Sequence, residues 1–147
     1  MLLNRSTQYT LQALLYLAEQ PRGHMVLVRE IAQRLDLPLH YLAKLMYPLT
    51  RVGWLDSSRG RNGGYRLRTE ARRLSLLAIL HHLQADGAGE DCLLGLKSCG
   101  DDDACVLHCQ WRPIREEMHD HLGTLTLGEI ASGKHALPAG LFRMRHP

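Results

Sequence analysis

The fold is decided by residues 30–67, EIAQRLDLPLHYLAKLMYPLTRVGWLDSSRGRNGGYRL. Apolar residues recur at helical spacing over residues 28–36 and again over 38–52, which predicts two consecutive helices. Pro38 separates them, because the residue before a proline is driven out of the helical region. Pro48 lies inside the second pattern and is expected to kink or shorten that helix. Two helices joined by so short a turn are typical of a helix-turn-helix.

A glycine-rich turn follows the second helix. The segments 54–57 and 65–68 on either side of it are short and strand-like, so they predict a β-hairpin. Ahead of residue 30, residues 8–20 have helical apolar spacing and residues 24–28 predict a minimal strand or helix lead-in. The resulting fold class is mostly α with a small β-hairpin wing, in the order of a winged helix-turn-helix.

The second half of the chain is predicted to be helical around a loop. Helices are expected at residues 74–85, about 105–125 and 126–132, with a Gly- and Asp-rich loop at 86–104. The longest helix has apolar positions that step by 3, 4, 4 and 3, close to a heptad seam. These are Trp111, Ile114, Met118, Leu122 and Leu125. The chain thus divides into a DNA-binding domain (1–73), a helical and cysteine-rich part (74–132) and a flexible tail (133–147).

Composition narrows the class of protein. The 147 residues are 45% hydrophobic but contain only one Phe, so an aliphatic core of one domain with an appended element is expected. No apolar run reaches the ~18–20 residues that span a bilayer, and the first residues lead us to expect no secretory signal. The expected location is the reducing cytoplasm, with no membrane partner and no structural disulfides.

Charge is divided unevenly along the chain. Residues 1–73 hold 12 Lys and Arg against 5 Asp and Glu, a net charge of +7, whereas residues 74–147 hold 6 against 10, a net charge of −4. A basic half of this kind suits contact with a polyanion. The alternative is a solvated basic surface without a partner.

Candidate DNA contacts lie on the second helix of the pair and on the hairpin. Recognition helices touch base edges with their N-terminal residues, and a basic glycine-rich tip can enter a minor groove or clamp phosphates. The candidates are His40, Tyr41, Lys44, Arg51, Arg59, Arg61, Asn62 and Gly63. Tyr65, which starts the return strand, is expected to be a core residue.

All four cysteines fall in one short segment, Cys92-x6-Cys99-x5-Cys105-x3-Cys109, with His108 beside the last. Structural zinc usually uses closer thiol pairs, whereas long loops between thiols suit an iron–sulfur cluster. Zinc and free buried cysteines remain alternatives. His108 and Cys109 differ by about 100° around a helix, so they are not expected to face one cluster together. No catalytic arrangement of Ser, His or carboxylates is found, and no enzyme is expected.

These stretches resemble the Rrf-type winged-helix transcriptional regulators, the family of IscR, NsrR and RirA. The resemblance is carried by Tyr9 ahead of LQALLYLA, by residues 30–67, and by the three thiols that lead into CVLHCQWR and LTLGEIASG. It covers about residues 1–132. It implies a homodimer held by the long helix, a palindromic double-stranded DNA operator and an iron–sulfur cluster near the dimer interface.

The resemblance also implies ligands. Cys92, Cys99 and Cys105 match the family's thiolates, and His108 matches the histidine of the IscR branch, with Cys109 as the alternative fourth ligand. Gln8 stands where the NsrR branch has an acidic ligand, and the first thiol gap is one residue longer than in IscR. This set favours a 2Fe–2S cluster, with 4Fe–4S possible.

The expected function is therefore a cluster-dependent DNA-binding transcriptional regulator, acting as a repressor that senses iron, redox state or nitric oxide. Two alternatives stand beside it. One is a small iron–sulfur redox protein, for which the basic hairpin is incidental. The other is a zinc-stabilised DNA-binding repressor without sensing.

Overall fold

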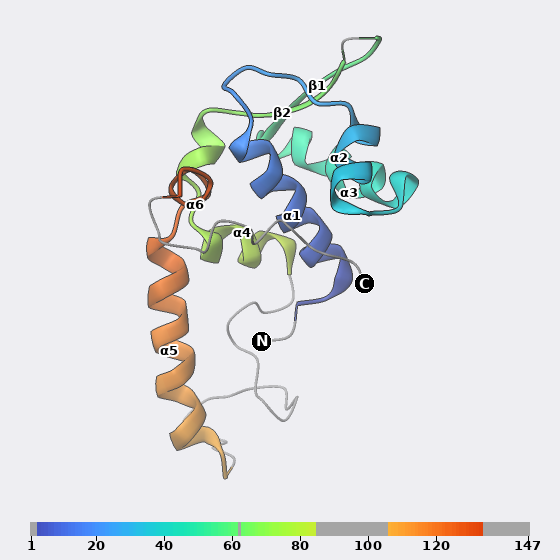
Figure 1. The fold of residues 1–147 in the computed structure, drawn as a ribbon. Coiled ribbons are helices and arrows are strands. Elements are labelled where there is room, and N and C mark those ends of the chain that lie inside the picture. The colour runs from blue at the N-terminus through green and yellow to red at the C-terminus, as the bar shows by residue number, and fades with distance from the viewer. Residues whose placement is uncertain (1–2, 62, 85–105, 134–147) are drawn as a thin grey trace.

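The computed structural model describes residues 3–61, 63–84 and 106–133 and has a mostly helical fold with one β-hairpin (Figure 1). The predicted fold class is confirmed. In chain order the elements are α1 (Arg5–Glu19), α2 (Val28–Leu35), α3 (Leu39–Arg51), β1 (Leu55–Ser58), β2 (Gly64–Leu67), the 3-10 helix η1 (Glu70–Arg73), α4 (Leu76–Leu83), α5 (His108–Thr124) and α6 (Leu127–Ala131).

Helix α1 begins three residues before the apolar pattern predicted. The side chain of Asn4 accepts a hydrogen bond from the backbone N–H of Thr7 at 2.8 Å, which caps the helix. The first turn is polar, so hydrophobic spacing alone could not reveal it. Thr7 is nevertheless buried, and the apolar face behind it contains Leu14 and Leu17.

A tight turn separates α2 from α3. Asp36 has a left-handed backbone with φ of 52°, and its N–H donates to the carbonyls of Ala32 and Gln33. Helix α3 then continues through Pro48 to Arg51, so the expected shortening at Pro48 was wrong. The proline lies within the last turn, where it removes a single helical hydrogen bond close to the helix end.

The hairpin is anchored to the segment before α2. Strands β1 and β2 pair antiparallel from Leu55 opposite Leu67 to Ser58 opposite Gly64, and Val26 adds a one-residue bridge to Tyr65. The bridge consists of two backbone hydrogen bonds of 2.8 Å between Val26 and Tyr65. The minimal strand or helix lead-in predicted at 24–28 is therefore a single bridge, which holds β2 against the segment before α2.

The C-terminal elements return to the N-terminal ones. Leu76 donates to the carbonyl of Leu125 at 2.8 Å, and Leu127 donates to that of Leu74 at 3.1 Å, so α6 is joined to the start of α4. Thr126 caps α6 in a capping box with Glu129. Helix α6 packs against α1, whereas α5 extends away from the rest of the molecule on the side opposite the hairpin (Figure 1).

One cluster of buried side chains holds these elements together. It is almost wholly aliphatic, as the single Phe predicted, and draws on α1, α2, α3, the hairpin, α4 and α6. Its fully buried members include Leu14, Val26, Ile31, Leu42, Met46, Leu55, Ile79 and Leu127. Among the residues that the structure describes, none of the helices is long and apolar enough to cross a membrane.

Candidate functional site

Helix α3 presents its predicted DNA contacts on the surface. Leu42, Met46 and Leu49 are buried against the core, while His40, Tyr41, Lys44 and Arg51 are exposed. Tyr41 is 40% exposed because its ring packs edge-on against that of Tyr9 in α1, with ring centroids 6.0 Å apart. The helix thus offers a polar, basic outer face and contains no acidic residue.

Sequence reasoning missed Tyr47. At 100° per residue, His40, Lys44, Tyr47 and Arg51 lie within about 60° of one another around α3, directly opposite its buried residues. We call these four residues the α3 outer row. Tyr47 is 58% exposed, and the guanidinium of Arg51 lies 6.0 Å from the centroid of its ring. The members of this row are spaced by 4, 3 and 4 residues, and that spacing is the sequence signal that could have identified Tyr47.

Tyr65 of β2 is partly buried and packs against the core, in line with its predicted role. Burial raises the pKa of the Tyr65 phenol above its ordinary value, and the phenol of Tyr47 raises that pKa further. Helix α3 itself packs against β1, the first strand of the hairpin.

Three of the predicted DNA contacts lie at the hairpin tip, two of them exposed on the surface and one buried within the turn. Arg59 and Arg61 are exposed, and Gly60 between them has φ of 105°. Gly63 is buried, and a Cβ there would lie 2.3 Å from the carbonyl oxygen of Ser58. Gly63 thus shapes the turn from within. Asn62 lies outside the described residues.

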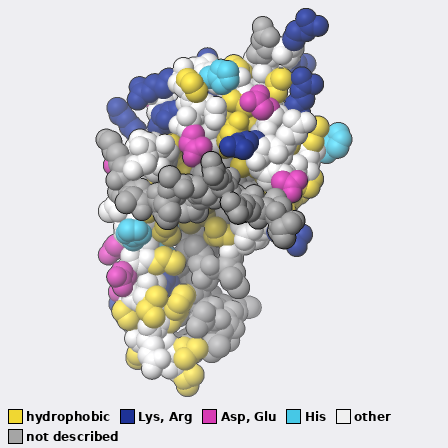
Figure 2. All heavy atoms as spheres, in the orientation of Figure 1, with side chains coloured by type: hydrophobic (Ala, Val, Ile, Leu, Met, Phe, Trp, Pro, Cys, Tyr) yellow, Lys and Arg dark blue, Asp and Glu magenta, His cyan; other side chains and the backbone are white. Residues whose placement is uncertain are grey.

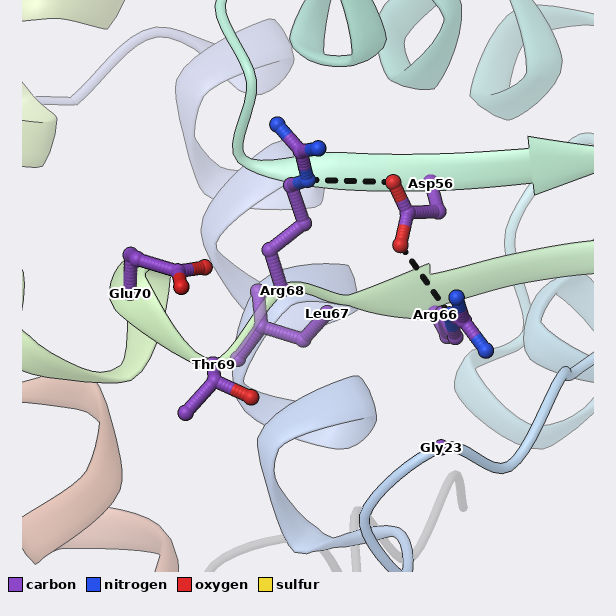
Figure 3. A pocket seen from close by; sticks show the side chains of 7 residues that line it. All are labelled: Gly23, Asp56, Arg66, Leu67, Arg68, Thr69 and Glu70. Atoms are coloured by element: carbon purple, nitrogen blue, oxygen red, sulfur yellow. Dashed lines mark hydrogen bonds and ion pairs between the residues drawn. The ribbon is translucent and has the colours of Figure 1, made fainter.

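The base of the hairpin holds a shallow opening of about 290 Å³ between the turn at Gly23 and η1 (Figure 3). The carboxylate of Asp56 lies between two arginines, with Arg66 and Arg68 each 3.0 Å away from one of its oxygens. All three side chains are partly exposed, so these pairs contribute little to stability. They do offset positive charge at the base, which leaves Arg59 and Arg61 as the cations at the tip.

Surface charge follows the same division as the sequence. Lys and Arg side chains are spread over the end of the molecule that carries the hairpin, while exposed hydrophobic side chains lie along α5 (Figure 2). Ile114 is 56% exposed, and the other positions of the predicted heptad seam are half-buried. The seam is thus only partly covered within one chain.

Helix α4 contacts the base of the hairpin. The ring of His82 in α4 lies 4.7 Å from the ring of Trp54, the buried residue just before β1. On the neighbouring face of α4, the ring of His81 meets that of His119 in α5 edge-on, with centroids 6.1 Å apart. Side-chain contacts therefore run from α5 through α4 to the hairpin.

The predicted cluster ligands are only partly within the described residues. Cys92, Cys99 and Cys105 lie outside them, as do the predicted loop at 86–104 and most of the tail. His108 is the first residue of α5 and is 5% exposed, whereas Cys109 is exposed. The two side chains do have different surroundings, which agrees with their expected separation around the helix.

The chemistry of these donors fits an iron–sulfur group. Within the described residues no group of three or more His, Cys, Asp or Glu is arranged to hold a metal ion. The predicted site would combine the three other thiols with a donor from the start of α5. Thiolates with a histidine are a known donor set for such clusters. The buried imidazole of His108, three residues after Cys105, is the donor that this part of the chain can add.

A helix-turn-helix with a basic hairpin wing, an exposed outer face on its second helix and a packed core behind it defines a winged-helix DNA-binding regulator. The sequence profile of the Rrf2 family, "Iron-dependent Transcriptional regulator", matches residues 3–133. The chain belongs to this family, as its sequence resemblance predicted.

Relatives of known class support the same assignment. A putative HTH-type transcriptional regulator of Aquifex aeolicus is 30% identical over 142 residues, which cover 94% of this chain and 98% of the relative. The HTH-type transcriptional regulator IscR of Vibrio parahaemolyticus is 28% identical over 137 residues, covering 93% and 81%. These proteins are transcriptional regulators and not enzymes, as expected for this chain.

Solved structures share the fold over nearly the whole chain. The global cysteine regulator CymR of B. subtilis superposes with a TM-score of 0.73 at 26% identity and covers 90% of this chain and 97% of its own. The IscR of T. potens has a TM-score of 0.65 at 24% identity, with coverage of 92% and 90%. At that identity the second likeness concerns the fold alone.

Proposed function

We propose that this chain is an iron–sulfur cluster-dependent repressor whose α3 and hairpin bind double-stranded DNA. The observation that carries the proposal is the combination of an exposed, basic reading surface with a buried His108, three residues after the last of three thiols. Its test is anaerobic purification with counting of iron and acid-labile sulfide. DNA binding is then measured with the cluster present and removed, on a duplex selected by the protein from a randomised 30-base-pair library.

The proposed ligands are Cys92, Cys99, Cys105 and His108, with Cys109 as the alternative fourth ligand. The preference for a 2Fe–2S cluster over 4Fe–4S is carried over from the resemblance to the IscR branch. When bound, the cluster supplies a redox-active iron centre that can be oxidised, nitrosylated or lost. His108 must be neutral to donate to it, so its ligation is expected to weaken as the pH falls.

Two other outcomes are distinguished by the same measurement. A colourless protein with one zinc and no sulfide supports a zinc-stabilised repressor. A metal-free protein that binds the duplex as the cluster-loaded protein does would contradict the cluster-dependent function. The small redox protein is no longer a competitor, because the chain belongs to a family of transcriptional regulators.

We further propose that two chains pair through α5. Its 17 residues make a helix about 25 Å long, which starts at His108 and ends where α6 begins. Ordering of the cysteine segment at one end would change how two such helices pack, and hence the spacing of the two hairpins. A tenfold change in DNA affinity needs about 1.4 kcal/mol of such coupling.

The variant Ile114→Glu is expected to raise the dimer dissociation constant at least about 100-fold, because it buries an unpaired charge in the α5 pairing surface. Sedimentation analysis of the full chain measures this constant. Asp120→Asn is the matched control, since Asp120 is exposed on the opposite side of α5. A dimer unchanged by Ile114→Glu would refute pairing through this helix.

The variant Arg59→Ala is expected to weaken binding to selected and scrambled duplexes alike, by roughly tenfold, because a phosphate contact carries no sequence information. Fluorescence anisotropy at several salt concentrations should also show a salt slope smaller by about one. Arg112→Ala in α5 removes the same charge away from the hairpin and should change neither quantity. Equal affinities of Arg59→Ala and wild type would rule out the hairpin as a DNA contact.

A further inference from the structure

Tyr47 has no evident role in holding the fold together. Its side chain is 58% exposed, against 40% for Tyr41, so the ring gains little from burial. An aromatic ring left in water on an otherwise basic helix face is typical of a binding surface, where Tyr contributes both a flat apolar face and a hydroxyl.

The position of Tyr47 relative to Arg51 is specific. The guanidinium carbon lies 6.0 Å from the ring centroid, within the range of a cation–π contact. The ion pairs formed between described residues involve Asp56 and Glu116, and Arg51 takes no part in them. The ring of Tyr47 is therefore the group that restricts where the Arg51 side chain lies.

Both residues belong to the C-terminal half of α3. The N-terminal residues of a recognition helix reach base edges, whereas later turns run along the phosphates that flank the groove. Helix α3 ends at Arg51 and β1 begins at Leu55, so this end of the helix leads directly into the wing. This is a place where a backbone phosphate can be met from two sides.

We propose that Tyr47 is a positioning residue that holds the Arg51 guanidinium against a DNA phosphate at the edge of the groove. The inference rests on the proposed binding of DNA by α3. Arg51 supplies the positive charge. The ring of Tyr47 restricts the Arg51 side chain before DNA binds, so that less conformational entropy is lost on binding. Such a contact strengthens binding to every sequence and does not discriminate between sequences.

The test is a double-mutant cycle on the full chain, with affinities measured by fluorescence anisotropy on the selected duplex and on a scrambled one. Tyr47→Ala is expected to weaken binding to both duplexes by the same factor, about two- to fivefold per recognition helix. Tyr47→Phe keeps the ring and should retain near wild-type affinity. In the Arg51→Ala background, Tyr47→Ala should have almost no further effect.

Salt dependence separates this role from a structural one. Arg51→Ala should reduce the salt slope by about 0.9 and Tyr47→Ala by a part of that amount, whereas a general loss of stability would leave the slope unchanged. Val52→Ala, an exposed neighbour outside the α3 outer row, is the control and should match wild type. Thermal unfolding followed by circular dichroism checks that every variant is folded.

The inference is overturned if Tyr47→Ala binds like wild type, if its effect persists in full without Arg51, or if it acts on only one of the two duplexes. Equal losses in Tyr47→Phe and Tyr47→Ala would also overturn it, since they would assign the effect to the hydroxyl. A wild-type protein that binds no duplex overturns the proposed function as well. Wild-type binding with an unaffected Tyr47→Ala variant overturns this inference alone.

Discussion

Replacing Cys92, Cys99 and Cys105 together with Ala is expected to give a colourless protein without iron or acid-labile sulfide, whose affinity for the selected duplex differs at least tenfold from that of the cluster-loaded wild type. The thiolates are the strongest donors in the proposed ligand set, to which the described residues contribute His108 and, as the alternative, Cys109. Loss of the cluster removes the coupling of about 1.4 kcal/mol that a tenfold change represents.

Anaerobic metal and sulfide analysis, absorption spectra and anisotropy titrations measure these quantities. The fourth ligand is resolved by two neighbouring variants. His108→Ala should alter the spectrum, while Cys109→Ala should not, because His108 is buried and Cys109 is exposed. The proposal fails if air-free wild type supplied with iron and sulfide stays colourless and binds the duplex as the triple variant does.

Replacing Gly64 with Ala is expected to lower the free energy of unfolding by at least about 3 kcal/mol. Gly64 has φ of 124°, which other residues rarely adopt, and a Cβ there would lie 2.1 Å from the carbonyl oxygen of Val26. The carbonyl belongs to the bridge that anchors the hairpin, so the strand must move away from Val26. DNA affinity should fall with it, because Arg59 and Arg61 would lose their support.

Urea denaturation gives the free energy of unfolding. Gly23→Ala is a close control, since Gly23 also has a positive φ, of 82°, but has no neighbouring atom within 4 Å of an added Cβ. In that variant the free energy of unfolding should fall only by the cost of the strained backbone conformation, about 1–2 kcal/mol. Equal losses in both variants would show that contact with Val26 does not limit residue 64.

Much of the fold could be predicted because its signals are local. The order of helices, the turn before Pro38 and the hairpin around residues 59–64 follow from apolar spacing, proline and glycine, and the structure confirms them within a few residues. The start of α1 at Arg5 was missed because Asn4 caps a polar first turn. The helix predicted over 38–52 is present, and Pro48 does not shorten it because one lost hydrogen bond near a helix end costs little.

The candidate site was predictable only in part. His40, Tyr41, Lys44 and Arg51 could be chosen from their place on a basic helix, and all four are exposed. Tyr47 was overlooked because a tyrosine among the apolar residues of a helix usually belongs to the core. Its proposed role depends on the contact between its ring and the Arg51 guanidinium, and that contact is visible only in the three-dimensional structure.

The sequence by itself therefore determined the class of elements, their order, the basic reading half and the gathering of thiols, since each depends on residues close together in the chain. Tertiary structure alone decided that Gly64 lies against Val26, that the ring of Trp54 contacts that of His82, and that His108 is buried while Cys109 is exposed. Such contacts join residues brought together by packing of the whole core, and no local pattern encodes which backbone or ring will be the neighbour.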